Sequence, residues 1–505
     1  MSTRPETTPD TLRLSTAWPW LVAVVVLVLV RSWPYAWWPT IAFDADQAVV
    51  GLMAKHIAEF RAAPVYQYAL PYVLMVTAYV TAPFMWVLGA TPFALKLPLV
   101  LMNVAVALLL VGAIMRAGIR PGWAAVLATP SIVPSGVASA GLMDALGMTV
   151  EPNLFVLLLW WLRPAPIAFG LVAAVGFHVR EFVAYGVAAV VAVDLVRGAL
   201  LTREGRAHWV AVGLSALGTS GLIAGWARFA ATRGPGTWLG EDGASNLGTL
   251  GNAFCFVPGQ AVRNVVELGA SYLGLLWGAV PAPLSDAAVH TTVRQGLPWA
   301  WLVLGLLMVA ACARVVLGLG RLWGRRDEEP VTLGLFLCLV GAQAVLVYAV
   351  SRCGSVTVIT IRYALLGVFL PTGLALLLWS CGVGRAWRQA AGATLLALAA
   401  LNVWPHVQLW REQLRTPSIS NRELLGPALE ARGLRYARSD YWTAYYVSFI
   451  TQERVIVGAD TLSRIDEYER TLARHAPEVV RIGTRPCGAS AAIVPGYFVC
   501  RTNVP

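Results

Sequence analysis

Charged residues are scarce in this 505-residue chain, in which Asp, Glu, Lys and Arg together make up 13% of the sequence. In a soluble protein the usual share is about a quarter. Hydrophobic residues make up 58%. This balance excludes an ordinary soluble enzyme, a disordered chain and a small disulfide scaffold. The sequence therefore predicts a membrane protein with several spans.

Lysine is almost absent, because only Lys55 and Lys96 occur and Arg carries most of the net charge of +11. The basic residues fall at the ends of apolar runs, so the charge indicates membrane orientation and no nucleic-acid partner. The seven cysteines contain no Cys-x-x-Cys pair, which excludes a zinc ribbon or a thioredoxin-type site. No small-x-small cleavage site follows the first apolar run, which predicts a retained signal anchor.

The apolar runs predict an all-α polytopic bundle of about eleven transmembrane helices. A further run at 76–90 is short and contains Pro83, and we interpret it as re-entrant or interfacial. The eleven predicted spans are 17–36, 93–115, 122–140, 149–162, 165–179, 182–196, 208–229, 297–319, 331–350, 363–380 and 389–405.

The distribution of Arg predicts the orientation of the bundle. With residues 1–16 as a cytoplasmic tail, every inner loop is short and carries Arg. Residues 17–405 then form the transmembrane domain of a cell (inner or plasma) membrane protein. The outer face receives the loops 37–75 and 230–296, the segment 351–362 and the C-terminal tail 406–505. No internal repeat of the kind found in transporters occurs.

The tail 406–505 predicts a small extracytoplasmic α/β domain. The expected order is helix 421–432, strand 434–437, a helix from Tyr441 capped by Asp440, strand 454–457, helix 465–475 and two late strands. The neighbouring Tyr441 and Trp442 are either core residues or a sugar contact. Cys487 and Cys500 lie in the same outer domain, so they are candidates for a disulfide in an oxidising compartment.

The first outer loop contains the main catalytic candidates. Asp44 and Gln47 have the spacing of a capping box, in which each side chain satisfies a free amide of the first helical turn. Asp46 falls in the first turn without a capping duty, and its ionised carboxylate is suited to act as a general base on an acceptor hydroxyl. First-turn acids are also common for structural reasons alone. The helix that follows carries Lys55 and Glu59 as an i,i+4 pair and is expected to lie at the membrane surface.

Two further groups of polar residues lie on the outer side. His178, Arg180 and Glu181 separate two short spans; they either line a cavity or form a pair that ties helices together, with Asp144 and Glu151 as possible partners or as a second acid.

Arg352 and the step Arg362-Tyr363 precede a late span. An Arg there can bind a phosphate through two hydrogen bonds, or serve with Tyr as an interfacial anchor.

These residues converge on a known family. The stretch 43–57, with Asp-Gln-Ala-Val-Val-Gly-Leu-Met-Ala at its centre, resembles the first outer loop of GT-C glycosyltransferases, above all family 39, which includes protein O-mannosyltransferases and aminoarabinose transferases. Arg362-Tyr363 before a span containing Pro371 is similar to a late pattern of such bundles. The tail segment 439–442, with Thr451, Glu453 and Arg454, resembles that of bacterial members.

The resemblance implies a transfer of a sugar from a polyprenyl-phosphate donor to a glycan, lipid or protein acceptor on the outer face, with inversion. Asp46 matches the acid of the family loop. Members often have Asp-Glu where this chain has Asp46-Gln47, so Asp44, Asp144 or Glu151 would replace the second acid.

The cations expected to stabilise the leaving phosphate are, in order, Arg362, Arg352 and Arg180, with Lys55 weaker. No cofactor is required, although a divalent metal can assist in relatives. The alternatives are a lipid or polymer transporter and a non-catalytic subunit of a cell-envelope complex.

Overall fold

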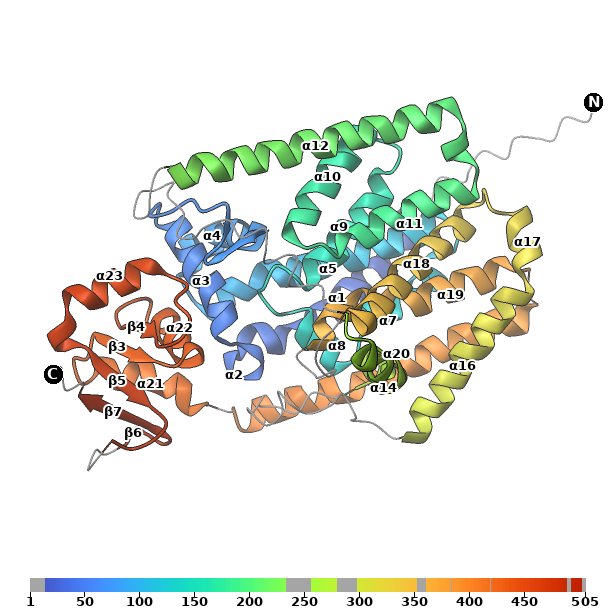
Figure 1. The fold of residues 1–505 in the computed structure, drawn as a ribbon. Helices are drawn as coiled ribbons and strands as arrows, with labels where there is room; N and C mark the ends of the chain where they lie inside the picture. Colours follow the sequence, from blue (N-terminus) through green and yellow to red (C-terminus); the bar gives the residue numbers. More distant parts are fainter. Residues whose placement is uncertain are drawn as a thin grey trace, which may run out of the picture.

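A computed structural model describes residues 14–232, 256–278, 298–351, 360–382, 384–417, 419–487 and 492–501. The expectations for Arg352, for nearly all of the tail 1–16 and for most of the loop 230–296 lie outside these residues. The described chain forms an elongated helical bundle with a sheet-containing C-terminal domain at one end (Figure 1).

The first part of the bundle runs through two short strands and eleven helices. These are α1 (Leu14–Trp37), α2 (Pro39–Ala42), α3 (Ala45–Ala58), β1 (Tyr66–Gln67), β2 (Leu70–Leu74), α4 (Val76–Leu88), α5 (Pro92–Arg116), α6 (Pro121–Leu127), α7 (Thr129–Ile132), α8 (Gly136–Gly141), α9 (Val150–Leu162), α10 (Pro166–Val179) and α11 (Val183–Val196).

The second part contains the longest helices. Its elements are η1 (Ala199–Leu201), α12 (Arg203–Thr232), α14 (Pro258–Leu276), α16 (Pro298–Leu317), α17 (Leu319–Gly324), α18 (Glu329–Val350), η2 (Thr360–Val368), α19 (Phe369–Ser380) and α20 (Arg385–Arg415). Helix α20 continues past the predicted end at residue 405 and leads from the bundle to the C-terminal domain (Figure 1).

The prediction of a polytopic helical bundle is confirmed. Among the described residues, six helices are long and apolar enough to cross a membrane, and five shorter apolar helices accompany them. The predicted span 122–140 is wrong as one helix, because the chain there breaks into α6, α7 and α8. Pro130 and Pro134 lack the amide hydrogens that an unbroken helix needs. The run at 76–90 forms the helix α4 with Pro83 inside it.

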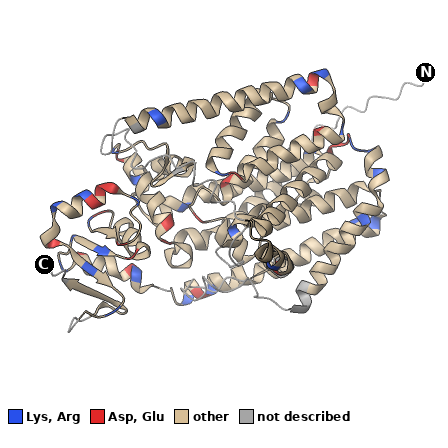
Figure 2. Ribbon diagram, in the orientation of Figure 1, with Lys and Arg blue, Asp and Glu red and all other residues tan. Residues whose placement is uncertain are grey.

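Charged residues are sparse along the bundle and gather at the end away from the C-terminal domain, and on that domain (Figure 2). At the bundle end, Arg163 pairs with Glu329 at 2.5 Å and Arg197 pairs with Asp327 at 3.4 Å. The loops that the sequence assigns to the inner side therefore meet at one end, opposite the C-terminal domain.

The C-terminal domain has a mixed five-stranded sheet with the order β4-β3-β5-β7-β6. Strand β3 is parallel to β4 and β5, and β7 is antiparallel to β5 and β6. The elements are α21 (Asn421–Glu430), β3 (Tyr436–Ser439), α22 (Tyr441–Ile450), β4 (Ile456–Ala459), α23 (Asp466–Arg474), η3 (Ala476–Glu478), β5 (Val480–Gly483), β6 (Ala492–Val494) and β7 (Tyr497–Arg501).

The expected α/β order is confirmed with one addition. Asp440 caps α22 as predicted, since its Oδ1 accepts a hydrogen bond from the Thr443 amide at 3.1 Å. Three late strands occur where two were predicted. The third arises because Gly496 adopts a φ of +81° between β6 and β7, which lets the chain reverse into a hairpin.

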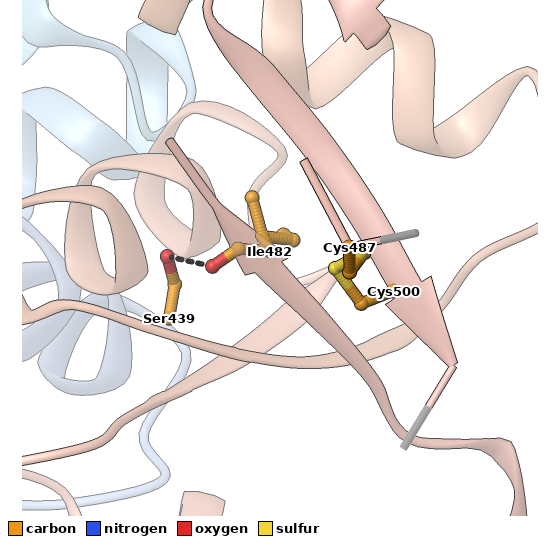
Figure 3. Close-up of a disulfide and its surroundings, with 4 residues drawn as sticks. All are labelled: Ser439, Ile482, Cys487 and Cys500. Carbon is orange, nitrogen blue, oxygen red and sulfur yellow. Dashed lines mark hydrogen bonds between the residues drawn. A yellow bond between two sulfur atoms is a disulfide. The ribbon is translucent and has the colours of Figure 1, made fainter. Parts of the chain in front are cut away.

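A disulfide joins Cys487 to Cys500 with a Cα–Cα distance of 5.9 Å (Figure 3). It ties β7 to the segment that follows β5. Next to it, the Ser439 hydroxyl donates to the Ile482 carbonyl at 3.0 Å and joins the end of β3 to β5. The pairing that the sequence left as a candidate is therefore present in the structure.

Helix α3 lies between the bundle and the C-terminal domain. Phe43, just before it, contacts Tyr446 and Phe449 of α22, with ring centroids 5.4 and 5.5 Å apart. The sequence predicts a helix at the membrane surface with Lys55 and Glu59 on its polar side. In the structure most of α3 is buried, including Lys55 and His56, because residues distant in sequence cover that side.

Gly51 permits this close packing of α3 against α22. A Cβ at position 51 would lie 2.6 Å from a carbon of the Phe449 ring. We expect Gly51→Ala to lower the thermal unfolding midpoint of the purified protein, because overpacking of this kind costs about 1–3 kcal/mol. Gly213→Ala in α12 is the control, since nothing lies within 4 Å of its new Cβ. Equal midpoints for the two variants would contradict the packing described here.

Candidate active site

Asp44 occupies the N-cap of α3, as predicted, and its Oδ1 accepts a hydrogen bond from the Gln47 amide at 3.0 Å. The reciprocal half of the predicted capping box is wrong. The Gln47 side chain instead donates to Asp144 Oδ1 at 3.3 Å and accepts from the Ala145 amide at 3.2 Å. Gln47 thus joins Asp144 to the first turn of α3.

Lys96 of α5 is a buried cation near these acids. Its Nζ donates to the carbonyl of Ala42 at 2.8 Å and to the carbonyl of Met143, the residue before Asp144. Its charge acts on both Asp44 and Asp144. Sequence reasoning missed Lys96 because it falls inside an apolar run, yet a lysine in such a run is itself a signal of function.

Burial raises the pKa of Asp144 to about 7, and the charges of Asp44 and Asp46 add to the effect while Lys96 opposes it. Burial, followed by the charge of Asp46, also raises the pKa of Asp44. Three neighbouring carboxyl groups cannot all ionise without a large cost. Asp44 and Asp144 are therefore the acids that their surroundings drive toward the neutral form.

Asp46 lies in the first turn of α3 and reaches the C-terminal domain. The Tyr441 hydroxyl of α22 donates to Asp46 Oδ1 at 2.6 Å. Arg464 Nε donates in turn to that hydroxyl at 3.3 Å. Asp46 Oδ2 has no hydrogen-bond donor among the described residues. One oxygen of the carboxylate is held, and the other is available.

Arg362, at the start of η2, is a second cation that the structure brings to these acids. Its charge acts on Asp44, Asp46 and Asp144. Its Nε is buried and, within the described chain, has no hydrogen-bond partner. Tyr363 lies beside it, with the guanidinium carbon 5.6 Å from the ring centroid. A buried N–H without a partner is costly, so the group is suited to receive an anionic ligand.

Arg180 follows α10 and is 7% exposed. Its Nη2 donates to Met148 Sδ at 3.5 Å, and its Nε is a second buried guanidinium N–H that has no partner in the described part of the chain. The buried Glu151 accepts from the Thr77 hydroxyl at 2.6 Å, and the Arg180 charge acts on it.

His178 and Glu181 flank Arg180. His178 lies half-buried in the last turn of α10, with its ring 6.2 Å from that of Phe177. Glu181 is also half-buried, and across the described ranges no ion pair joins it to Arg180. The Arg180–Glu181 form of the pair that would tie helices together is therefore not present in the described residues, and the charge of Arg180 acts on Glu151 instead.

Lys55 lies at the opposite end of α3 from Asp46, about 13 Å along the helix axis. Its ammonium group pairs with Glu59 at 2.8 Å and with Glu453 at 2.5 Å. Glu453 also accepts from His56, Arg61 and Tyr468 at 2.7 to 3.0 Å. Lys55 therefore belongs to the contact between α3 and the C-terminal domain.

In the described ranges, no three His, Cys, Asp or Glu side chains are placed so that they could hold a metal ion. Asp44, Asp46 and Asp144 are electrostatic neighbours, but Asp44 is engaged as a helix cap and Asp144 contacts Gln47. The described residues therefore do not assemble a three-ligand site for a divalent metal.

This bundle, with its polar site at the end that carries the C-terminal domain, has the fold of GT-C membrane glycosyltransferases. ArnT from Cupriavidus metallidurans bound to undecaprenyl phosphate aligns with a TM-score of 0.56 and 9% identity over 97% of this chain and 98% of ArnT. In its apo state the TM-score is 0.55, with 10% identity over 96% and 98%.

A second structure with the same fold is the archaeal oligosaccharyltransferase AglB from Archaeoglobus fulgidus, in complex with an inhibitory peptide and a dolichol-phosphate. It aligns with a TM-score of 0.51 and 11% identity over 93% of this chain and 70% of AglB. No protein-family model and no curated protein matches the sequence. The likeness therefore concerns the fold.

Proposed function

We propose that this chain is a membrane glycosyltransferase that moves a hexosyl or pentosyl group from a polyprenyl-phosphate donor to an acceptor hydroxyl. The observation that carries the proposal is the Asp46 carboxylate, of which Tyr441 holds one oxygen, together with Arg362, whose charge acts on Asp46 and whose buried Nε has no hydrogen-bond partner among the described residues. The polyprenyl phosphates bound to ArnT and AglB support the choice of donor. The acceptor is a glycan, a lipid or a protein.

The proposed step is an inverting displacement. Asp46 takes the proton of the acceptor hydroxyl, and the oxygen attacks the anomeric carbon from the face opposite the phosphate. The bond between that carbon and the phosphate oxygen breaks, and polyprenyl phosphate leaves with the electron pair. Arg362 and Arg180 stabilise the charge that develops on the leaving group. The step uses protein side chains alone.

The proposed setting is the outer face of a cell membrane, with the N-terminus in the cytoplasm and the C-terminal domain outside. Arg-bearing loops meet at the bundle end opposite that domain. The disulfide between Cys487 and Cys500 fits an oxidising compartment.

The test is to incubate the purified protein with a panel of labelled polyprenyl-phosphate sugars and membrane acceptors. The proposal expects one donor to be consumed and its sugar to appear on an acceptor. A transporter would move labelled lipid across reconstituted vesicles without consuming the donor. Movement without consumption would overturn the assignment.

Arg362→Ala is expected to raise the KM for the donor at least tenfold, because a charged hydrogen bond to phosphate contributes about 1.5–3 kcal/mol. Arg362→Lys should recover only part of the loss, since an ammonium group cannot match the planar two-point contact. Arg116→Ala is the control, because Arg116 lies over Trp161 at the opposite end of the bundle. Equal KM values for all variants would remove Arg362 from the phosphate site.

A further inference from the structure

The hydrogen bond between Asp46 and the C-terminal domain is the basis of a further inference, which rests on the proposed function. We propose that Tyr441, oriented by Arg464, is a positioning residue for the Asp46 carboxylate, so that the C-terminal domain completes the active site. Asp46 and Tyr441 are 395 positions apart in the chain.

The hydrogen bond itself has the geometry of a strong, charge-assisted contact. The Tyr441 oxygen lies 2.6 Å from Asp46 Oδ1, within the 2.5–2.7 Å typical of a hydroxyl donating to a carboxylate. Burial, together with the charge of Asp46, raises the pKa of Tyr441 above its ordinary value. Tyr441 therefore keeps its proton at neutral pH and acts as a donor.

Arg464 sets the direction of that donation. Its Nε–H points at the Tyr441 oxygen at 3.3 Å, and its guanidinium carbon lies 5.7 Å from the Tyr441 ring centroid. Arg464 also donates to the Tyr68 carbonyl of the first outer loop at 3.5 Å. With a donor aimed at its lone pair, the Tyr441 oxygen directs its own hydrogen toward Asp46.

The arrangement selects one carboxylate oxygen for the reaction. Oδ1 is held by Tyr441, which fixes the side-chain torsions of Asp46, and Oδ2 keeps its basic lone pairs for the acceptor hydroxyl. A base has to be held in the productive geometry for efficient proton transfer.

Other contacts also join the C-terminal domain to the region of α3. The rings of Phe43 and Phe449 and the ion pairs of Glu453 join the same elements elsewhere. The Tyr441 hydroxyl is thus placed for Asp46 itself.

The test compares Tyr441→Phe with the wild type in steady-state kinetics over a range of pH. Removing one charge-assisted hydrogen bond should lower kcat about tenfold or more and leave the KM for the donor within about twofold. The acid limb of the kcat profile should move to higher pH, because the ionised form of Asp46 loses a donor. The charged and titratable groups that interact with this carboxylate are Asp44, Asp144, Arg362 and Tyr441. Lys96 acts on Asp44 and Asp144, and Arg464 contacts Tyr441.

Tyr446→Phe is the matched control on the same helix. It removes the same hydroxyl, but that hydroxyl hydrogen-bonds Ser420 beside α21. The control should keep the wild-type kcat and pH profile. Arg464→Gln removes the guanidinium that orients Tyr441. It should change kcat and the pH profile in the same direction as Tyr441→Phe does, but by less.

Three results would overturn the inference. Tyr441→Phe could match the wild type in kcat and pH profile, or it could lower only the unfolding midpoint, as a structural hydroxyl would. A wild-type protein that consumes no donor would overturn both this inference and the proposed function. An active wild type with an unaffected Tyr441→Phe variant would overturn the inference alone.

Discussion

Asp46→Asn is expected to abolish sugar transfer while the protein accumulates in the membrane at the wild-type level. Asn keeps the size of the side chain and an oxygen that accepts from Tyr441, which lies 2.6 Å from Oδ1 in the wild type. It cannot take the proton of the acceptor hydroxyl. Loss of a general base costs about 10²–10⁴-fold in rate, so residual transfer should fall below about 1%.

Asp44→Asn is the matched control for this result. Asp44 caps α3, and Asn is as good an N-cap as Asp. We therefore expect Asp44→Asn to retain at least about a tenth of the wild-type rate. A larger loss at position 44 than at position 46 would reverse the two roles and place the base at Asp44.

Glu453→Gln is expected to produce the largest loss of stability. Glu453 is nearly buried and accepts from Lys55, His56, Arg61 and Tyr468. Its removal leaves the buried ammonium group of Lys55 with only the exposed Glu59 as an acidic partner, and breaking a buried ion pair typically costs about 3–5 kcal/mol. The midpoint of thermal unfolding in detergent should drop clearly, and transfer should fall with it as α3 and α22 separate.

The backbone beside this contact adopts a strained conformation. Gln452 and Glu453 leave α22 with φ values of +54° and +64°, a conformation that costs an L-residue about 1–2 kcal/mol. Glu453→Gln leaves this backbone cost unchanged, so a change in its unfolding midpoint reports the loss of the side-chain charge. The control is Glu430→Gln, which breaks an exposed pair with Arg454 and should cost less than about 1 kcal/mol. Equal losses for the two variants would contradict the role given to Glu453.

The same contact predicts a pH dependence. Burial opposes ionisation of Glu453, but the hydrogen bonds from His56 and Lys55 and the charge of Arg61 hold its pKa well below the ordinary value. Such a carboxylate contributes stability that is fully present above its unfolded pKa of about 4.3 and is lost as the pH falls through the folded pKa. The difference in the free energy of unfolding between the wild type and Glu453→Gln should therefore become smaller below about pH 4.

Local patterns in the sequence predict much of this fold. Apolar runs locate most of the membrane helices, and single residues such as Asp44 and Asp440 mark helix starts because a cap acts within three residues. The span 122–140 fails because hydrophobic content alone does not register where Pro130 and Pro134 interrupt the helix.

The candidate site could be predicted only in part. Asp46, Arg362 and Arg180 carry signals in their own neighbourhoods, since they are ionisable groups near the ends of apolar runs. Tyr441 and Glu453 contact α3 from positions about 400 residues away. No local period or cap encodes such contacts, and they depend on how two domains pack.

One measurement decides whether the proposed reaction takes place at this site. Release of polyprenyl phosphate from its labelled sugar donor would be followed over time with wild-type protein and with Asp46→Asn in the same acceptor-containing vesicles. We expect release by the wild type in step with sugar appearing on the acceptor, and release by the variant at less than about 1% of that rate. Equal release by the two proteins would contradict the assignment of sugar transfer to the Asp46 site. Intact sugar lipid that crosses the vesicle membrane would contradict it as well.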